Sequence, residues 1–248
     1  MKPNEVIAVT GASRGIGAAI AVTLALRGFT VGCLSRGGEG PVGIEVAPDV
    51  ASRFVNVACD VTNEESVKQA FLTLTKEAGH LKGLVNNAGI HLGGASSNFS
   101  TSDFNYVMAT NTTAVFVACR EAYPYLVAAG GGTIVNIGSF FDKMGVKRSL
   151  AYCASKAAVG SITRCLAVEW ASKGIRVLDV APGYIVTDLN REELNTEPLQ
   201  GYLKGRIPVR APAPPEDVSR LVASILSEEI PFLTGETIYI DGGQGIAH

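Results

Sequence analysis

The sequence predicts an α/β fold, with a single doubly wound parallel sheet (Rossmann-like) and helices on both faces. Short apolar runs alternate with longer segments of helical periodicity along nearly the whole chain, and this alternation is typical of βαβ units with right-handed crossovers. Hydrophobic residues make up 47% of the chain and charged residues 18%, as expected for parallel strands covered on both faces. We expect residues 1–248 to form one domain, because a chain of this length buries a large core without disulfides or metal.

Each predicted element follows from its apolar pattern and from the turn residues that end it. For example, Ile16, Ile20 and Leu24 share one face of a helix that Gly28 ends. In chain order, the predicted strands cover residues 6–10, 30–34, 54–58, 83–85, 133–137, 175–180 and 237–240. The predicted helices cover residues 15–27, 64–78, 103–126, 151–171 and 215–226.

Two segments interrupt this alternation. Residues 36–53 contain several glycines and two prolines, which favour a loop or a reduced helix over a regular crossover. Residues 186–214 are polar and contain four prolines. Such an insertion in a compact domain is typical of a functional lid, with a plain surface excursion as the alternative.

Charge, hydropathy and cysteine content argue against several classes of protein. The formal net charge is −2 without a long charged run, so neither nucleic acid nor a membrane surface is an expected partner. No apolar stretch reaches the ~18 residues of a spanning helix, and the first apolar run is too short for a signal peptide, so we expect a cytoplasmic protein. The five cysteines lack Cys-x-x-Cys spacing, which predicts reduced core residues and no metal site.

A glycine-rich turn between the first strand and the first helix predicts a dinucleotide site. Residues without a Cβ let the backbone approach a pyrophosphate, and the helix N-terminus supplies N–H groups. The spacing is Gly-x-x-x-Gly-x-Gly, which differs from the Gly-x-Gly-x-x-Gly fingerprint, so a merely tight turn is the alternative. The predicted cofactor contacts here are Gly11, Ser13, Arg14, Gly15, Ile16 and Gly17.

The end of the second predicted strand bears on the choice of cofactor. NAD-binding sites commonly place a carboxylate there, whereas this chain has Ser35 and Arg36. Arg36 and Arg14 could hold a 2′-phosphate through charge-assisted hydrogen bonds. We therefore expect NADP(H) to be preferred, with NAD(H) possible; the alternative is that both arginines are solvated surface charges.

Four polar residues form a candidate catalytic set. Tyr152 and Lys156 are four residues apart, so they share one helix face. Ser139 follows the fifth predicted strand, and Asn111 lies in a predicted helix. A carbonyl that accepts hydride needs a proton from a positioned acid, and a nearby ammonium favours the phenolate of a tyrosine.

Taken together, these motifs resemble the short-chain dehydrogenase/reductase family over nearly the whole chain. The glycine turn, the catalytic set, Asn86-Asn87-Ala88-Gly89 and Pro182-Gly183 carry the resemblance. It implies that Tyr152 is the general acid/base and that Lys156 lowers its pKa and reaches the nicotinamide ribose. Ser139 would orient the substrate oxygen, and Asn111 would hold a water that links Lys156 to solvent.

The resemblance also implies further cofactor contacts. Asp60 and Val61 would lie at the adenine, and the 182–187 segment at the nicotinamide amide. Because several of these segments follow predicted strands, they should converge at the carboxyl edge of the sheet, although the Asn-Asn-Ala-Gly stretch could equally be a structural turn. The implied contacts are Asp60, Val61, Asn87, Ala88, Gly89, Tyr152, Lys156, Pro182, Gly183, Ile185 and Thr187.

The predicted function is NADP(H)-dependent interconversion of a carbonyl (ketone or aldehyde) and an alcohol by hydride transfer. The Tyr152–Lys156 interval argues against enoyl reduction, because enoyl reductases of related fold place these two residues further apart. The alternatives are a 3-oxoacyl carrier-protein reductase and a non-catalytic NADP-binding regulator. The expected substrate is a small carbonyl or alcohol compound between the lid and an apolar wall formed by residues 91–95, 140–144, Leu150 and Tyr184.

Family members commonly assemble as tetramers through two long helices, so we expect a homo-oligomer, a tetramer or dimer. Ala114, Val117, Ala158 and Ile162 are compatible with an interface, and the alternative is that they face the sheet. Leu178-Asp179 lies in a predicted buried strand, where many relatives carry an asparagine followed by a small residue. A buried acid at Asp179 needs a partner that the sequence does not identify.

Overall fold

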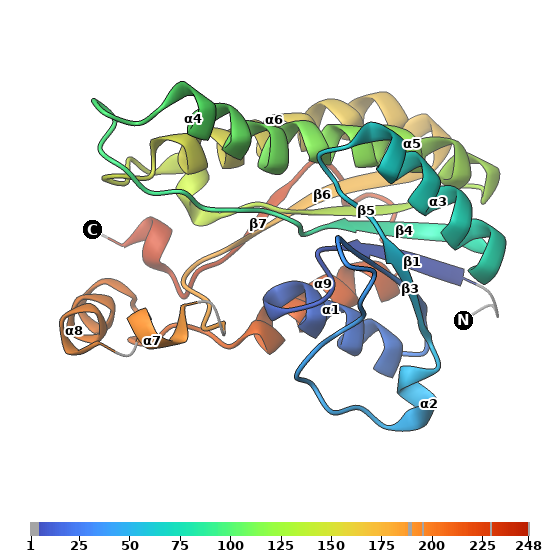
Figure 1. Ribbon diagram of the computed structural model, residues 1–248, viewed down its shortest axis with the longest axis horizontal. Helices are drawn as coiled ribbons and strands as arrows, with labels where there is room; N and C mark the ends of the chain where they lie inside the picture. Colours follow the sequence, from blue (N-terminus) through green and yellow to red (C-terminus); the bar gives the residue numbers. More distant parts are fainter. Residues whose placement is uncertain (1–4, 188–189, 195, 229, 248) are drawn as a thin grey trace.

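The computed structural model describes residues 5–187, 190–194, 196–228 and 230–247. All strands in this part of the chain are parallel and form one sheet in the order β3-β2-β1-β4-β5-β6-β7. Helices cover both faces (Figure 1), so the predicted doubly wound fold is confirmed. The strands are β1 Glu5–Thr10, β2 Thr30–Ser35, β3 Phe54–Ala58, β4 His80–Asn86, β5 Gly132–Ile137, β6 Ile175–Pro182 and β7 Thr237–Ile240.

Two helical layers enclose the sheet. Helices α1 (Gly15–Leu26) and α9 (Pro215–Ser227) cover one face, and α3 (Glu64–Ala78), α5 (Ala114–Ala128) and α6 (Leu150–Trp170) cover the other (Figure 1). Successive strand residues point to opposite faces, so Ile134 joins the apolar cluster on the α3/α5/α6 side and Val135 joins the cluster on the α1/α9 side. Burial on both faces explains why the strands are almost uniformly apolar.

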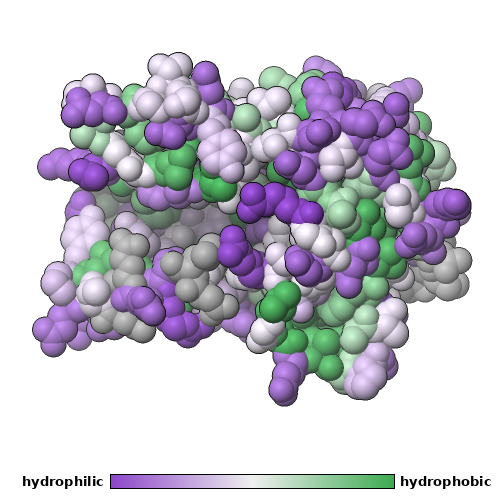
Figure 2. Space-filling view, in the orientation of Figure 1, coloured by the Kyte–Doolittle hydropathy of each residue, from purple (hydrophilic) through white to green (hydrophobic). Residues whose placement is uncertain are grey.

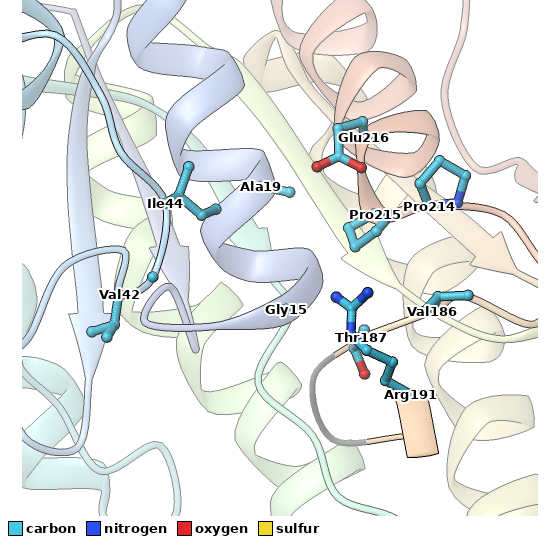
Figure 3. Close-up of a pocket in the computed structure, with 11 residues that line it drawn as sticks. Gly15, Ala19, Val42, Ile44, Val186, Thr187, Arg191, Pro214, Pro215 and Glu216 are labelled. Carbon is cyan, nitrogen blue, oxygen red and sulfur yellow. The ribbon is translucent and has the colours of Figure 1, made fainter. Parts of the chain in front are cut away.

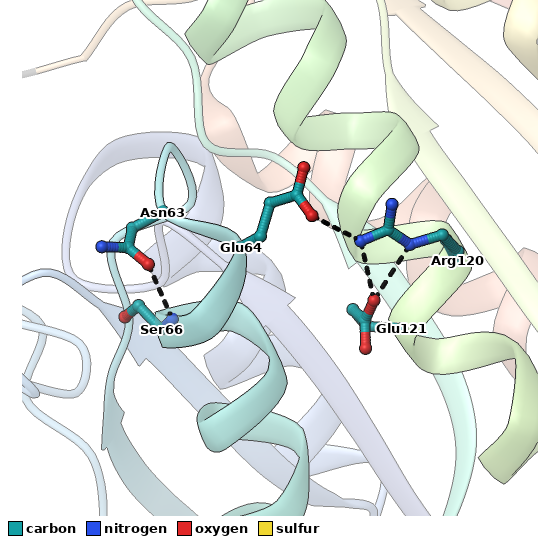
Figure 4. Close-up of polar contacts among 5 residues, drawn as sticks. All are labelled: Asn63, Glu64, Ser66, Arg120 and Glu121. Carbon is teal, nitrogen blue, oxygen red and sulfur yellow. Dashed lines mark hydrogen bonds and ion pairs between the residues drawn. The ribbon is translucent and has the colours of Figure 1, made fainter.

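Side-chain bonds fix the start of α3 and its contact with α5. Asn63 caps α3 by accepting a hydrogen bond from the Ser66 N–H at 3.0 Å (Figure 4). Arg120 of α5 pairs with Glu64 at 2.8 Å and with Glu121 at 2.9 Å. These ion pairs are exposed and contribute little stability, but they occupy the Arg120 guanidinium.

The strand limits were predicted well, with one exception. Six of the seven predicted strands agree with the structure to within two residues at each end. The exception is β4, predicted as residues 83–85, because His80 and Lys82 break its apolar pattern near the rim of the sheet.

The predicted helix 103–126 has a different structure. It consists of α4 (Thr101–Met108), a π-helical turn (Ala109–Thr113) and α5. Such π turns are rare and occur frequently at functional sites, and this one contains Asn111.

The two interrupted segments also acquire short helices. Residues 36–53 contain only α2 (Pro48–Ala51), as the breaker residues predicted. The predicted lid contains α7 (Arg191–Leu194) and α8 (Glu197–Arg206), which lie beyond the ends of the strands (Figure 1). Residues 188, 189 and 195 of the predicted lid lie outside the described part of the chain.

Two predictions about buried residues need correction. Ala114 and Val117 are 4% and 2% exposed in the single chain, and Val117 belongs to the apolar cluster beneath α3, α5 and α6, which favours the alternative over an interface at these two positions. Cys165 is exposed on α6 and is not a core residue, whereas Cys33, Cys59 and Cys119 are buried as expected. Surface position on a helix that packs on a sheet depends on the rotation of the helix, which periodicity alone did not resolve here.

Candidate active site

The predicted site residues converge at the carboxyl edge of the sheet. Strands β1, β4, β5 and β6 are consecutive neighbours, and the glycine turn, Asn87, Ser139 and Gly183 follow their carboxyl ends. This edge includes the point between β1 and β4 where the strand order reverses, and doubly wound sheets bind ligands at such a point.

A hydrogen-bonded brace joins the glycine turn to the Asn-Asn-Ala-Gly segment. The Thr10 hydroxyl accepts hydrogen bonds from the N–H groups of Asn87 at 3.0 Å and Ala88 at 3.1 Å. In return, the Asn87 amide donates to the carbonyls of Thr10 at 3.0 Å and Gly11 at 3.2 Å. Asn87 thus has a structural role, and Thr10 is a residue that the sequence reasoning missed; its signal was a hydroxyl ending an otherwise apolar strand.

The glycines of the turn are required by close approach and by backbone conformation. Gly11 has a φ of +65°, and a Cβ there would lie 3.0 Å from the Ala88 Cα. A Cβ on Gly17 would collide with the Gly11 carbonyl and the Asn87 amide. The next helix, α1, has no acidic residue in its first turn and no side-chain cap from Arg14, so the residues present fit an anionic pyrophosphate at this helix end.

The loop after β2 folds back over this turn. The N–H of Val42 donates to the Ser13 carbonyl at 2.9 Å, and Arg36 and Arg14 are both exposed. The Asp60 carboxylate accepts hydrogen bonds from the N–H and hydroxyl of Thr62 at 2.9 and 2.7 Å. These bonds, with a smaller contribution from Arg36, lower the pKa of Asp60, and they direct its carboxylate toward its own loop.

The end of β6 leads from the sheet into the lid. A Cβ on Gly183 would lie 2.7 Å from the Asp241 Cα, and a Cβ on Gly15 would lie 3.5 Å from the Thr187 methyl. Asn190 holds this segment, because its amide donates to the Ile185 carbonyl at 2.9 Å and accepts from the Thr187 N–H at 2.7 Å. The start of the lid is therefore packed against the glycine turn.

A cavity of about 320 Å³ adjoins the N-terminus of α1. It lies between α1, the 42–44 loop, the lid and the start of α9, and the Arg191 guanidinium extends toward it (Figure 3). Arg191 was not predicted, because its only signal is a single basic residue in a polar lid. The cavity is lined by Gly15, Ala19, Val42, Gly43, Ile44, Val186, Thr187, Arg191, Pro214, Pro215 and Glu216.

Ser139, Tyr152 and Lys156 lie together as predicted. Ser139 caps the short helix Phe140–Lys143 by accepting from the Phe141 N–H at 3.3 Å, and it also hydrogen-bonds Tyr152. Lys156 is buried, donates to the Ile137 carbonyl at 2.7 Å, and lies 5.6 Å from the centroid of the Tyr152 ring.

The pKa values of Tyr152 and Lys156 both shift in the direction that favours the neutral form of the group. Burial raises the pKa of Tyr152, and the hydrogen bond from Ser139 only partly opposes this. The chain's own groups therefore do not lower this pKa as we expected, because desolvation of the phenolate has the largest effect on it. Burial also lowers the pKa of Lys156 to about 8, while Asp179 acts in the opposite direction.

Asn111 links the loop after β4 to α6. Its amide donates to the Ile90 carbonyl at 2.8 Å and to the Ser155 hydroxyl at 3.1 Å, and its oxygen accepts from the Ile90 N–H at 2.8 Å. A Cβ on Gly89 would lie 3.3 Å from the Asn111 amide oxygen and 3.8 Å from the Lys156 ammonium. The two groups thus flank Gly89, and the amide oxygen keeps one lone pair.

Aromatic rings surround Tyr152. His91 lies edge-on to it at 5.0 Å and Phe141 at 6.0 Å between ring centroids, and Phe141 also contacts Tyr184. The His91 ring is hydrogen-bonded to Ser149 at 3.1 Å. These rings belong to the predicted substrate wall, and Figure 2 shows the surface hollowed between the α4/α6 layer and the α7–α8 segment.

The described residues contain neither a helix that could span a membrane nor a metal-binding cluster. No helix among them has the length and apolarity that a membrane span requires. In the same part of the chain, no three His, Cys, Asp or Glu side chains are placed to hold a metal ion.

Fold and site together define an oxidoreductase with a Rossmann-like sheet. The family model described as enoyl-(acyl carrier protein) reductase matches residues 11–244. Glucose 1-dehydrogenase of Gluconobacter oxydans (strain 621H) is 35% identical over 240 residues, covering 96% of this chain and 90% of that protein. The human 3-oxoacyl-[acyl-carrier-protein] reductase is also 35% identical over 240 residues, covering 97% of this chain and 98% of that protein.

The solved structures agree. Thermoplasma acidophilum aldohexose dehydrogenase matches with a TM-score of 0.87 and 31% identity, covering 99% of this chain and 96% of that chain. The chain belongs to the short-chain dehydrogenase/reductase family, as the sequence motifs indicated. It is an oxidoreductase of CH–OH and C=O groups, and members of this family use NAD(P)(H).

Proposed function

We propose that this protein reduces a ketone or aldehyde, and oxidises the corresponding alcohol, with NADP(H) as cofactor and Tyr152 as general acid/base. The proposal rests on one observation: Ser139, Tyr152 and Lys156 lie close together beside the glycine turn. The nicotinamide, when bound, supplies hydride to the carbonyl carbon or accepts it from the alcohol. The protein supplies the proton and the geometry.

Each catalytic side chain has one task in this proposal. The Ser139 hydroxyl donates a hydrogen bond to the substrate oxygen and orients it. The Tyr152 phenol gives its proton to the alkoxide oxygen that forms, and the Lys156 ammonium stabilises the phenolate left behind. Because burial raises the pKa of Tyr152, the phenol stays protonated until charge develops on the substrate.

The proton on Tyr152 must be replaced after each reduction. Asn111 and Lys156 flank Gly89, and a water held there by the Asn111 amide oxygen would connect the Lys156 ammonium to solvent. The π-helical turn supports this role, because it presents Asn111 toward Ile90 and Ser155.

Cofactor preference rests on the end of β2. Arg36 and Arg14 are exposed there, Asp60 is bonded to Thr62, and the other nearby acid, Glu39, lies against Gly37 in the loop after β2. A 2′-phosphate would gain charge-assisted hydrogen bonds from the two arginines. We further propose that Arg191 supports the pyrophosphate from the lid side, because it lines the cavity next to Gly15.

The substrate is proposed to be a small carbonyl or alcohol compound. Two of the relatives above carry names of sugar dehydrogenases and one the name of an acyl-carrier-protein reductase. Docking of an acidic carrier protein on α5 is disfavoured, because Arg120 is already paired with Glu64 and Glu121. The four-residue Tyr152–Lys156 interval disfavours enoyl reduction.

We also propose that the protein is a homo-oligomer in the cytoplasm. The helices α4, α5 and α6 expose apolar side chains in the single chain, and a second copy would cover them. These side chains are Tyr106, Phe116, Val127, Leu150 and Val168.

The test follows the absorbance of NADPH with a panel of ketones, aldehydes and sugars. We expect Tyr152→Phe to lose at least about 100-fold in kcat with cofactor affinity retained, since general acid catalysis contributes 10²–10⁴-fold. Tyr125→Phe, in which the ring packs on Phe71 away from the site, is the matched control. Full turnover in Tyr152→Phe would contradict the role of Tyr152 as general acid/base. NADPH binding without turnover of any panel member would contradict the proposal and favour a regulator.

A further inference from the structure

Asp179 is a buried carboxylate in the middle of the sheet. It lies on β6 with no exposed surface, and Thr237 on β7 donates a hydrogen bond to its Oδ2 at 3.2 Å. A Cβ on Gly138 would overlap the carboxylate, and a Cβ on Gly160 would lie 3.9 Å from Oδ2. Two glycines therefore leave space for this charged group.

The carboxylate is the charged member of a row of polar side chains that crosses four strands. Asn86, Asn136, Asp179 and Thr237 are register partners on β4, β5, β6 and β7. The Asn86 amide donates to the Asn136 side-chain oxygen at 2.9 Å, and Asn136 donates to Thr163 at 2.9 Å. Neutral groups satisfy the rest of the row, so hydrogen bonding alone does not require a charge at Asp179.

The position of Lys156 gives a reason for a charged carboxylate at Asp179. Lys156 and Gly160 are one helical turn apart on the same face of α6, so the carboxylate beneath Gly160 lies close to the buried ammonium. Their attraction favours the charged form of both groups. Lys156 and Asp179 do not form a direct ion pair in the structure; Lys156 donates instead to the Ile137 carbonyl.

Other charged or titratable groups near the carboxylate lie on three elements. Asp142, on the short helix after β5, accepts a hydrogen bond from Tyr239 of β7 at 2.7 Å and opposes ionisation of Asp179. Arg164 is exposed, and its Nη1 lies 3.4 Å from a Cβ placed on Gly160, the same position that lies 3.9 Å from the Asp179 Oδ2. Among these groups, Lys156 is the buried cation.

We propose that Asp179 is a positioning residue that keeps the Lys156 ammonium charged at neutral pH, so that Lys156 can stabilise the Tyr152 phenolate. This inference rests on the function proposed above. Burial raises the pKa of Asp179 to about 6, and burial lowers the pKa of Lys156 to about 8. Both groups are therefore charged between about pH 6 and pH 8.

Each buried charge also opposes folding at neutral pH. The pKa of Asp179 is raised above its ordinary value of 3.8, so its contribution to stability is complete below that value and is lost as the pH rises through about 6. The pKa of Lys156 is lowered from 10.5, so its contribution is complete above 10.5 and is lost as the pH falls through about 8. A residue retained only for stability would not have this profile.

The experiment measures carbonyl reduction against pH with Asp179→Asn in the full-length protein. The alkaline limb is the part of the pH profile in which kcat falls as the pH rises. Without the carboxylate, this fall should occur about 1 pH unit lower, which is the size expected for the loss of one nearby opposite charge. Turnover should stay close to the unaltered protein at pH 6 and fall about fivefold at pH 8, as a 1-unit shift from a pKa of about 8 gives. The Tm at pH 7.5 should rise, because one buried charge is removed.

Controls separate this inference from the proposed function. Thr237→Val removes a hydrogen bond to the same carboxylate but keeps its charge, so its alkaline limb should not move. Asp179→Ser gives a second neutral variant. An unmoved limb in both neutral variants, an equal loss at every pH, or a lower Tm would overturn the role of Asp179; failure of the proposed function appears separately as full turnover in Tyr152→Phe.

Discussion

Replacing Thr10 with valine tests how the two cofactor-binding segments are held together. The Thr10 hydroxyl accepts hydrogen bonds from the N–H groups of Asn87 and Ala88. Valine has the same shape but no hydroxyl, so both N–H groups would lose their partner. Because Thr10 is only 3% exposed, water cannot readily replace the hydroxyl.

The expected cost follows from these two bonds. Each buried donor left without a partner costs about 1–3 kcal/mol, so we expect a loss of about 3 kcal/mol after local relaxation. For a chain of this length, that loss lowers Tm by about 6–12 °C. The glycine turn also loses its connection to Ala88, so NADPH affinity should fall about tenfold, equivalent to about 1.4 kcal/mol.

Thermal unfolding by circular dichroism and a fluorescence titration with NADPH measure the two effects. Thr10→Ser is the matched control, because it keeps the hydroxyl and removes one methyl group, at a cost of about 1 kcal/mol. If Thr10→Val matched Thr10→Ser in both Tm and NADPH affinity, the brace would not hold the site, and the reasoning would be refuted.

The remaining predictions concern the cofactor. Arg36→Asp should shift the ratio of kcat/KM for NADPH to kcat/KM for NADH toward NADH by about tenfold or more. The reason is that a hydrogen bond to a charged group contributes about 1.5–3 kcal/mol. An unchanged ratio would exclude Arg36 from the phosphate site. Arg191→Ala should raise KM for NADPH about tenfold with kcat nearly unchanged. Arg206→Ala, on α8 near Tyr202, is its control, and equal effects in both variants would exclude a specific role for Arg191.

Local patterns in the sequence were sufficient to predict most of the fold. Apolar periodicity marks the strands and helices, and glycines and prolines mark their ends. Six strands were therefore predicted to within two residues of their ends in the structure. The π-helical turn at Asn111 was not foreseeable in this way, because an inserted residue leaves the surrounding apolar pattern helical.

The candidate site was predicted where chain order alone brings groups together. Tyr152 and Lys156 are neighbours on any helix, and Ser139 and the glycine turn follow strands whose carboxyl ends must share one edge. Thr10 and Arg191 were missed, because their partners lie far away in the sequence and only the packing of β1, β4 and the lid shows what they contact.

By itself, the sequence determined the order of the elements, the glycine turn and the Tyr152–Lys156 pair, since these depend on covalent spacing and local backbone preference. Only the tertiary structure decided the charge properties of the site. The direction of the pKa of Tyr152 and the partner of Asp179 depend on how many separate segments exclude water from each group. Desolvation is a property of the assembled fold, and no local run of residues encodes it.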